Sequence, residues 1–201
     1  SALAAIVFSS MLWMNIILSR IVFGTRAGRR VIFGAVLGMS GIVLIFAPQI
    51  GAISFSDSIL VGCTLAMLGA LSASCGNITS QALQQRKLPV VQANAWGMFY
   101  GAVLTLIIAS AQGHEFTFDG TFTYIASLLS LAVFGSVVAF GAYLTLLGRI
   151  GAHRAGYATV MFPVVALLLS LLFEGLTLDL TIVLGTALVL LGNLLVLKER
   201  R

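Results

Sequence analysis

Long apolar stretches, separated by short polar connections, make up almost the whole chain. Seven of them are about 20 residues long or slightly longer, which is the length that a helix needs to cross the roughly 30 Å hydrocarbon layer of a membrane. They lie at about residues 2–23, 30–48, 58–84, 90–111, 122–147, 153–174 and 180–198. The pattern predicts an all-α fold, a polytopic membrane helix bundle with seven spans in this chain.

The few charged residues are sorted between the two ends of these spans. All eleven Lys and Arg residues lie at one set of ends, in segments 20–30, 86–87, 149–154 and 198–201. The opposite ends hold five of the six acidic residues and no base, which leaves Glu199 as the only acid on the basic side. Since connections rich in Lys and Arg stay in the cytoplasm, the basic ends and the C-terminus are predicted to be cytoplasmic.

Residues 4–46 and 155–197 resemble each other without gaps, at an offset of 151. The matching positions include three glycine pairs, Gly24/Gly175, Gly34/Gly185 and Gly41/Gly192. Chance similarity between two Leu- and Gly-rich hairpins is one explanation for the matches alone. The connecting loops favour a repeat, because residues 20–30 hold four arginines whereas residues 171–181 hold two acids and no base. The two hairpins are therefore expected to cross the membrane in opposite senses, as the inverted repeats of secondary transporters do.

The offset also predicts a longer protein. If the helices after residue 50 belong to the second repeat, the counterparts of three of them would precede this chain. We therefore expect ten spans in two inverted five-helix repeats, with the first three helices absent from this chain. Residues 1–50 would supply the last two helices of the first repeat, and residues 51–201 the second repeat with a short cytoplasmic tail. The alternative is a complete seven-helix protein whose N-terminus faces outward.

Composition narrows the classes of function. The chain is 60% hydrophobic and 8% charged, with a mean hydropathy of +1.11, whereas about a quarter of the residues of a soluble domain are charged. The bases lie in short clusters between the spans, so they mark membrane topology and predict no nucleic-acid partner. No ATP-binding loop is predicted, because neither Lys87 nor Lys198 follows a glycine. His114, in an outer loop, and His153, at a cytoplasmic turn, are the only histidines, so no metal site, cofactor or enzyme activity is expected.

Small residues recur every three or four positions along the third span. They are Gly62, Ala66, Gly69, Ala73 and Gly76. A stripe of this kind lets two membrane helices approach closely. It therefore predicts close helix packing on this face, with helix sliding as the alternative role.

The second half of the chain carries a specific motif. It consists of a short turn at residues 148–152, Pro163 inside the next helix, the helix end Phe173-Glu174-Gly175, and the pair Gly185 and Gly192. This run, from 135 to 193, resembles the second repeat of the EamA-type transporters of the drug/metabolite transporter superfamily. The resemblance extends over the whole second repeat and the last two helices of the first. In the first repeat, Leu12 stands where Pro163 does and Phe23 where Glu174 does.

Members of that family are ten-helix carriers or exporters of small metabolites, amino acids or drugs. The resemblance implies a secondary transporter, with export as the expected direction, that works by alternating access in the plasma membrane, here a bacterial inner membrane. The implied partners are a small-molecule solute and the lipid bilayer, and a homodimer is left open. The alternative is a noncatalytic membrane scaffold or a channel subunit.

Two residues are predicted to act in helix kinking or gating. Pro163 lacks a backbone N–H and leaves the carbonyl of Thr159 unpaired at membrane depth, so a kink is expected. The bent helix would line the solute cavity or serve as a hinge, and a packing kink is the alternative. Glu174 lies at the outer rim, where a carboxylate stays ionised at little cost, so a cap or gating contact is favoured over proton coupling.

Polar and aromatic residues within the spans are the candidates for a solute cavity, namely Trp13, Asn15, Ser72, Asn77, Tyr143 and Tyr157. Asn15 lies near the centre of the first span, where a clasp between two helices is the alternative role. Tyr143 and Tyr157 also fit an interface belt, since both lie toward cytoplasmic ends. Aromatic faces with scattered hydroxyls suit a small zwitterionic or aromatic solute.

Overall fold

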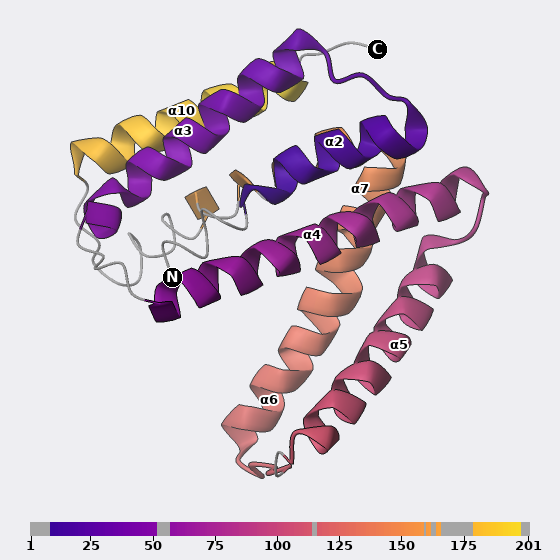
Figure 1. Cartoon of the computed structure of the whole chain (residues 1–201). Coiled ribbons are helices and arrows are strands. Elements are labelled where there is room, and N and C mark those ends of the chain that lie inside the picture. Colours follow the sequence, from indigo (N-terminus) through magenta and orange to yellow (C-terminus); the bar gives the residue numbers. More distant parts are fainter. Residues whose placement is uncertain are drawn as a thin grey trace. The chain divides into compact units, whose positions relative to one another are not determined.

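A computed structural model describes residues 9–51, 57–113, 116–158, 160–161, 164–165 and 179–197 of the chain. Every regular element in these ranges is helical (Figure 1). The predicted all-α fold class is confirmed for this part of the chain. Pro163 and Glu174, the predicted kink and gating residues, lie outside the described residues.

The helices follow the predicted spans. They are α2 (Met11–Phe23), α3 (Arg29–Gly51), α4 (Asp57–Gln85), α5 (Val90–Ala111), α6 (Phe122–Ser130), η1 (Leu131–Ala139), α7 (Phe140–Ile150), α8 (Ala152–Ala155) and α10 (Leu180–Leu197). Four stretches are long and apolar enough to cross a membrane, and they coincide with the second to fifth predicted spans: Arg29–Ala47, Ile59–Gln85, Val90–Ala111 and Phe122–Ile150. At the first and seventh spans the described helices, α2 and α10, are shorter and apolar. The sixth span is described only in part, from α8 to residue 165.

Turn chemistry sets several helix ends. α2 ends at Gly24, whose φ of 67° is a left-handed conformation that glycine adopts without a steric penalty. At the start of α10, the Asp179 carboxylate accepts the N–H of Leu180 at 2.7 Å. Before α6, the Asp119 carboxylate accepts the N–H of Thr121 at 2.9 Å. Negative charge is favourable at a helix N-terminus, so both acids stabilise the beginning of a helix.

The fifth predicted span consists of three consecutive helical segments, α6, η1 and α7 (Figure 1). The middle segment, η1, is a π-helix of nine residues. In a π-helix each N–H bonds to the carbonyl five residues back, and such segments are rare and mostly a single turn long. Nothing in the residue pattern of 131–139 predicts this geometry.

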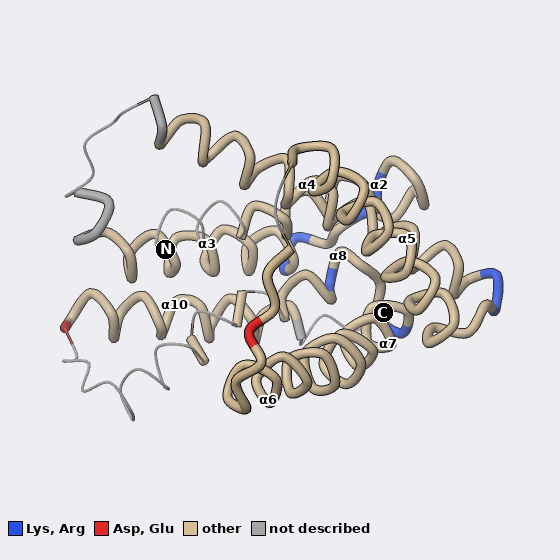
Figure 2. Tube along the Cα trace, turned by 90° about the horizontal axis from the view of Figure 1, so that it is seen from below, with Lys and Arg blue, Asp and Glu red and all other residues tan. Residues whose placement is uncertain are grey.

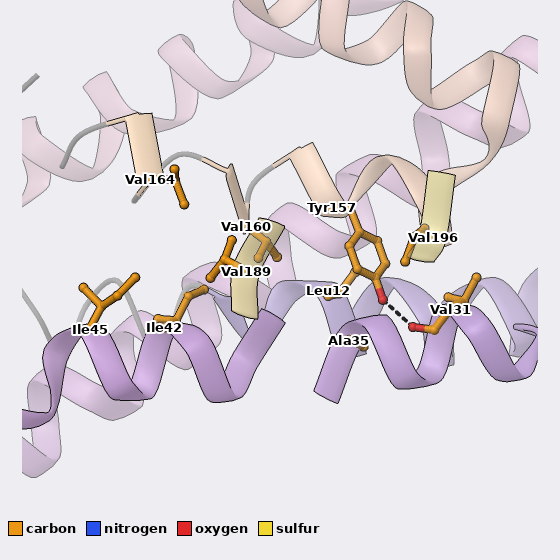
Figure 3. Close-up of a cluster of buried hydrophobic side chains, with 10 residues drawn as sticks. All are labelled: Leu12, Val31, Ala35, Ile42, Ile45, Tyr157, Val160, Val164, Val189 and Val196. Carbon is orange, nitrogen blue, oxygen red and sulfur yellow. Dashed lines mark hydrogen bonds between the residues drawn. The ribbon is translucent and has the colours of Figure 1, made fainter. Parts of the chain in front are cut away.

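The chain divides into two compact units, which are described separately. The first contains residues 1–78 and 150–201, and the second contains residues 79–149. In the first unit, α3 and α10 lie side by side (Figure 1). In the same unit, α2 contacts α8. The core of this unit is a cluster of buried side chains shown in Figure 3: Leu12, Val31, Ala35, Ile42, Ile45, Tyr157, Val160, Val164, Val189 and Val196.

In the second unit, three helical segments bury none of their described side chains. These segments are α5, α6 and η1. Large apolar residues such as Phe99, Leu104 and Phe134 are more than half exposed there. Such all-round apolar surfaces fit the hydrocarbon of a bilayer, in which exposure of these side chains carries no hydrophobic penalty.

Charged residues lie in the connections and at helix ends (Figure 2). Within the first unit, α3 and α10 are antiparallel, because Gly34 faces Gly192 and Gly41 faces Gly185. Asp179, just before α10, and the arginines at the start of α3 therefore lie at opposite ends of this helix pair. In this helix pair the acid and the bases are therefore sorted to opposite ends.

Candidate functional site

The glycines of the hairpin repeat meet in the contact between α3 and α10. A Cβ atom added to Gly34 would lie 2.6 Å from the carbonyl oxygen of Gly192. One added to Gly41 would lie 2.5 Å from the carbonyl oxygen of Gly185. These contacts are reciprocal, because Gly34 and Gly185 are equivalent in the repeat, as are Gly41 and Gly192. Helices approach this closely only where small residues face each other, so α3 and α10 pack antiparallel through glycines whose positions the offset of 151 residues relates.

The side chains beside these glycines show the same reciprocity. A Cβ on Gly34 would lie 2.6 Å from Cγ2 of Val196, and a Cβ on Gly185 would lie 2.6 Å from Cγ1 of Ile45. Ile45 and Val196 are themselves separated by the repeat offset of 151 residues. The matching contacts between α3 and α10 therefore extend along α3 from Gly34 to Ile45.

Tyr157, one of the predicted cavity residues, lies in the apolar core of the first unit. Its side chain is 2% exposed, and its hydroxyl donates a hydrogen bond to the backbone carbonyl of Val31 in α3 (Figure 3). Trp13 packs against the same core and is partly buried. The bond from Tyr157 satisfies a buried phenol, which otherwise carries a desolvation penalty, and it ties the beginning of the sixth span to the beginning of α3.

Asn15 and Asn77, two other predicted cavity residues, contact each other between α2 and α4. Nδ2 of Asn77 donates to Oδ1 of Asn15 at 3.4 Å. One turn earlier on each helix, the hydroxyl of Ser74 donates to the carbonyl oxygen of Met11 at 3.2 Å. The two bonds line up because Ser74 and Asn77 are three residues apart and Met11 and Asn15 are four apart, the spacings that share a helix face. These two bonds join α2 to α4 within two helices that consist mainly of apolar residues.

Two polar groups on the same face of α2 have no hydrogen-bond partner among the residues that the structure describes. They are Nδ2 of Asn15 and Oγ of Ser19, and both residues are 0% exposed. Next to Asn15 lies Gly156, at the end of α8, where an added Cβ would be 2.9 Å from Nδ2. Asn15 is thus enclosed by α2, α4 and α8, with donors left over after its bond to Asn77.

Two of the predicted cavity candidates remain, Ser72 and Tyr143. Ser72 is exposed on another face of α4, away from Ser74 and Asn77. Tyr143 belongs to the second unit, where its ring lies 6.2 Å from that of Phe140. Sequence reasoning missed Ser74 and Ser19. The signal that could have found them is helical spacing, since Ser74 precedes Asn77 by three residues and Ser19 follows Asn15 by four.

A further polar contact between helices lies in the second unit. Nε2 of Gln84, near the end of α4, donates to the carbonyl oxygen of Leu144 in α7 at 2.9 Å and to the hydroxyl of Ser80 at 3.2 Å. A Cβ on Gly148 would lie 1.8 Å from the amide oxygen of Gln84. The Gln84 amide therefore occupies the space that any larger residue at position 148 would need.

Comparison with known proteins decides the family. The sequence profile of the EamA-like transporter family matches residues 60–198, which is more than half of the chain. The chain belongs to the EamA-like transporter family, within the drug/metabolite transporter superfamily. The resemblance inferred from the 135–193 motif is confirmed.

Individual relatives are similar at low identity. An uncharacterized transporter of Bacillus subtilis, YoaV, is 27% identical over 159 residues, covering 79% of this chain and 53% of its own length. A probable amino-acid metabolite efflux pump of Escherichia coli is 26% identical over 176 residues, covering 83% of this chain and 57% of its own length. The uncharacterized inner membrane transporter YedA of Escherichia coli is 27% identical over 180 residues, covering 89% and 56%. The chain thus spans about half the length of the curated relatives it matches.

Proposed function

We propose that the protein is a secondary transporter that exports small metabolites, amino acids or drugs across the plasma membrane by alternating access. The observation that carries the proposal is the reciprocal packing of Gly34 on Gly192 and of Gly41 on Gly185. Two similar hairpins of opposite orientation are what an inverted-repeat carrier uses to open alternately to its two sides. The family assignment and the efflux pump among the relatives support the same function.

We propose a ten-span architecture for the complete protein. Residues 1–50 would be the last two helices of a first repeat, and residues 51–201 an inverted second repeat. The range matched by the family profile, 60–198, falls inside this second repeat. The share of the relatives' length that the chain spans, about half, also supports this architecture.

We place the basic helix ends and the C-terminus in the cytoplasm, with the membrane being a bacterial inner membrane. Support comes from the α3–α10 pair, which has Asp179 at one end and the arginines of α3 at the other. Excess Lys and Arg marks the cytoplasmic side. One of the relatives is named an inner membrane transporter. A homodimer stays a prediction.

Within this transporter, we place the solute path beside the polar contact of α2 and α4. Asn15 and Asn77 form this contact, and both belong to helices whose other residues at that depth are mainly apolar. A few convergent polar groups in an apolar surrounding are typical of sites for small solutes. The roles of Trp13, Ser72, Tyr143 and Tyr157 in the path stay predictions, as do those of Pro163 and Glu174.

An efflux assay tests the function. Cells that produce the protein and cells that lack it are loaded with dipeptides, and the rate at which the released amino acids leave the cells is measured. Faster efflux from the producing cells is expected, with a dependence on the proton gradient only if transport is coupled to protons. Equal efflux of every amino acid, together with equal sensitivity to a panel of toxic drugs and metabolite analogues, would reject the transporter and favour a scaffold.

A further inference from the structure

Two fully buried side chains of α2 offer hydrogen-bonding groups that no part of the described structure uses. Asn15 and Ser19 are four residues apart on one helix face, about 6 Å along the axis. Both are 0% exposed, and Nδ2 of Asn15 and Oγ of Ser19 lack a partner. Buried polar side chains are usually satisfied, so two unsatisfied groups on one face require an explanation.

The chemistry of the unused groups identifies what would satisfy them. Oδ1 of Asn15 already accepts a bond from Asn77, so what remains on Asn15 is the amide nitrogen with its two N–H donors. The hydroxyl of Ser19 adds an O–H donor that can point the same way. Donors of this kind, in a surrounding of low polarity, call for a strong acceptor such as a carboxylate or carbonyl oxygen. Asn77, which bonds to Asn15, and Leu12, which lies with Asn15 beside Gly156, carry no charge.

We propose that Asn15 and Ser19 bind the carboxylate or carbonyl oxygen of the transported solute, and that the contact between α2 and α8 covers this site in the structure. The inference rests on the transport function proposed above. It assigns the solute class as small molecules that bear an acceptor group, of which an amino acid is the simplest. The amide of Asn77 holds Asn15 in place through Oδ1 and leaves its N–H donors directed away from α4.

Gly156 explains how the site is covered. A Cβ on Gly156 would lie 2.9 Å from Nδ2 of Asn15 and 3.1 Å from Cδ1 of Leu12, so α8 comes this close to α2 only because residue 156 is glycine. The adjoining residues of α8, Ala152 and Ala155, are also small and buried. When α8 moves away from α2, the donors of Asn15 and Ser19 become available. The α3–α10 contact, which is backbone against backbone at Gly41 and Gly185, has no comparable unused group in the described residues.

Transport of three matched probes tests the proposal. The probes are radiolabelled L-phenylalanine, which has a carboxylate, L-phenylalaninamide, which keeps the carbonyl, and L-phenylalaninol, which keeps the ammonium group but has no carbonyl. The complete protein is reconstituted into liposomes as wild type, as Ser19→Ala and as Asn15→Leu. Matched controls are Ser110→Ala and Asn94→Leu, since both residues lie on α5, which buries no described side chain. Size-exclusion chromatography confirms that each variant is folded.

The expected result is a selective loss of apparent affinity. Ser19→Ala and Asn15→Leu should each raise KM for phenylalanine and phenylalaninamide by at least about tenfold, which corresponds to about 1.4 kcal/mol. Wild type should transport phenylalaninol poorly, with a KM that neither substitution changes, and both controls should behave as wild type. Ser19→Ala removes only one oxygen, so it tests the proposal even if Asn15→Leu fails to fold.

The possible failures are distinguishable. If folded Ser19→Ala protein transports phenylalanine with the same KM as the wild type, the proposed site is wrong and the transport function stands. Equal transport of phenylalaninol and phenylalanine by wild type overturns the requirement for an acceptor group. Wild-type protein that transports none of the three probes overturns the assignment of amino-acid-like solutes, and this inference with it, whereas transport of other solutes in the efflux assay would still support a transporter.

Discussion

Replacing Gly41 by alanine should weaken the contact between the two hairpin copies. An added Cβ would lie 2.5 Å from the carbonyl oxygen of Gly185, 2.8 Å from Cγ2 of Val189 and 2.9 Å from the backbone nitrogen of Val189. Two of these three atoms belong to the backbone of α10, so they cannot rotate away. Ordinary contact begins at 3.4 Å, so α3 and α10 would have to separate locally by about 0.9 Å, the difference between 3.4 and 2.5 Å.

The energetic consequence follows from this separation. A gap of 0.5–1 Å forfeits roughly a quarter to a half of the attraction of each affected atom pair, and overpacking of a well-packed contact costs roughly 1–3 kcal/mol. For a chain of this size, each kcal/mol lowers the melting temperature by roughly 2–4 °C. Gly41→Ala is therefore expected to lower the melting temperature of the purified protein by about 2–12 °C.

Thermal unfolding in detergent, followed by the loss of the folded peak in size-exclusion chromatography, measures this shift. Gly97→Ala in α5 is the matched control, because nothing lies within 4 Å of its added Cβ. Gly192→Ala should resemble Gly41→Ala, because the two positions are equivalent and its Cβ would lie 2.6 Å from the carbonyl oxygen of Gly34. A Gly41→Ala variant that melts with the Gly97→Ala control would refute the close approach of α3 and α10.

Three further outcomes are expected. Tyr157→Phe removes the hydrogen bond to the Val31 carbonyl and should reduce the free energy of unfolding by about 0.5–1.5 kcal/mol, measured by thermal unfolding; no change would show that this bond adds nothing to stability. Gly148→Ala should destabilise the fold in thermal unfolding, because the added Cβ displaces the Gln84 amide. In a Gln84→Ala background the Cβ meets no amide, so the same substitution should cause no loss of stability. An equal loss in both backgrounds would contradict this explanation. Neutral residues in place of three arginines, in the connection between α2 and α3 and in the first turn of α3, should increase labelling of a cysteine in that connection from the outer side. Unchanged labelling would contradict the charge-based topology. Those arginines are Arg26, Arg29 and Arg30.

The amino-acid sequence by itself determined the positions of the helices. Hydrophobic length and charge are local quantities, and a membrane requires every span to be an apolar helix of a nearly fixed length. The predicted spans at 30–48, 58–84, 90–111 and 122–147 therefore coincide with described helices. The 135–193 motif was enough to identify the family, which the family profile confirmed.

Which small residues form a close helix contact was decided only by the tertiary structure. The stripe on α4 was predicted to pack closely, yet nothing in the described structure lies within 4 Å of an added Cβ at Gly62, Gly69 or Gly76. Close backbone contacts are instead made by Gly41 with Gly185 and by Gly34 with Gly192. Glycine permits close approach wherever it occurs, but the approach also needs a complementary face on another helix, which lies far away in the sequence.

For the polar contact of α2 and α4 as well, the sequence determined the candidates and the fold decided their partners. The sequence indicated Asn15 and Asn77 as candidates because amides are rare in apolar spans. Only the fold paired them, added Ser74 beside them, and left Nδ2 of Asn15 without a partner next to Gly156. A residue type states which hydrogen bonds a side chain is able to make, whereas the positions of neighbouring helices decide which of those bonds are made and which remain for a ligand.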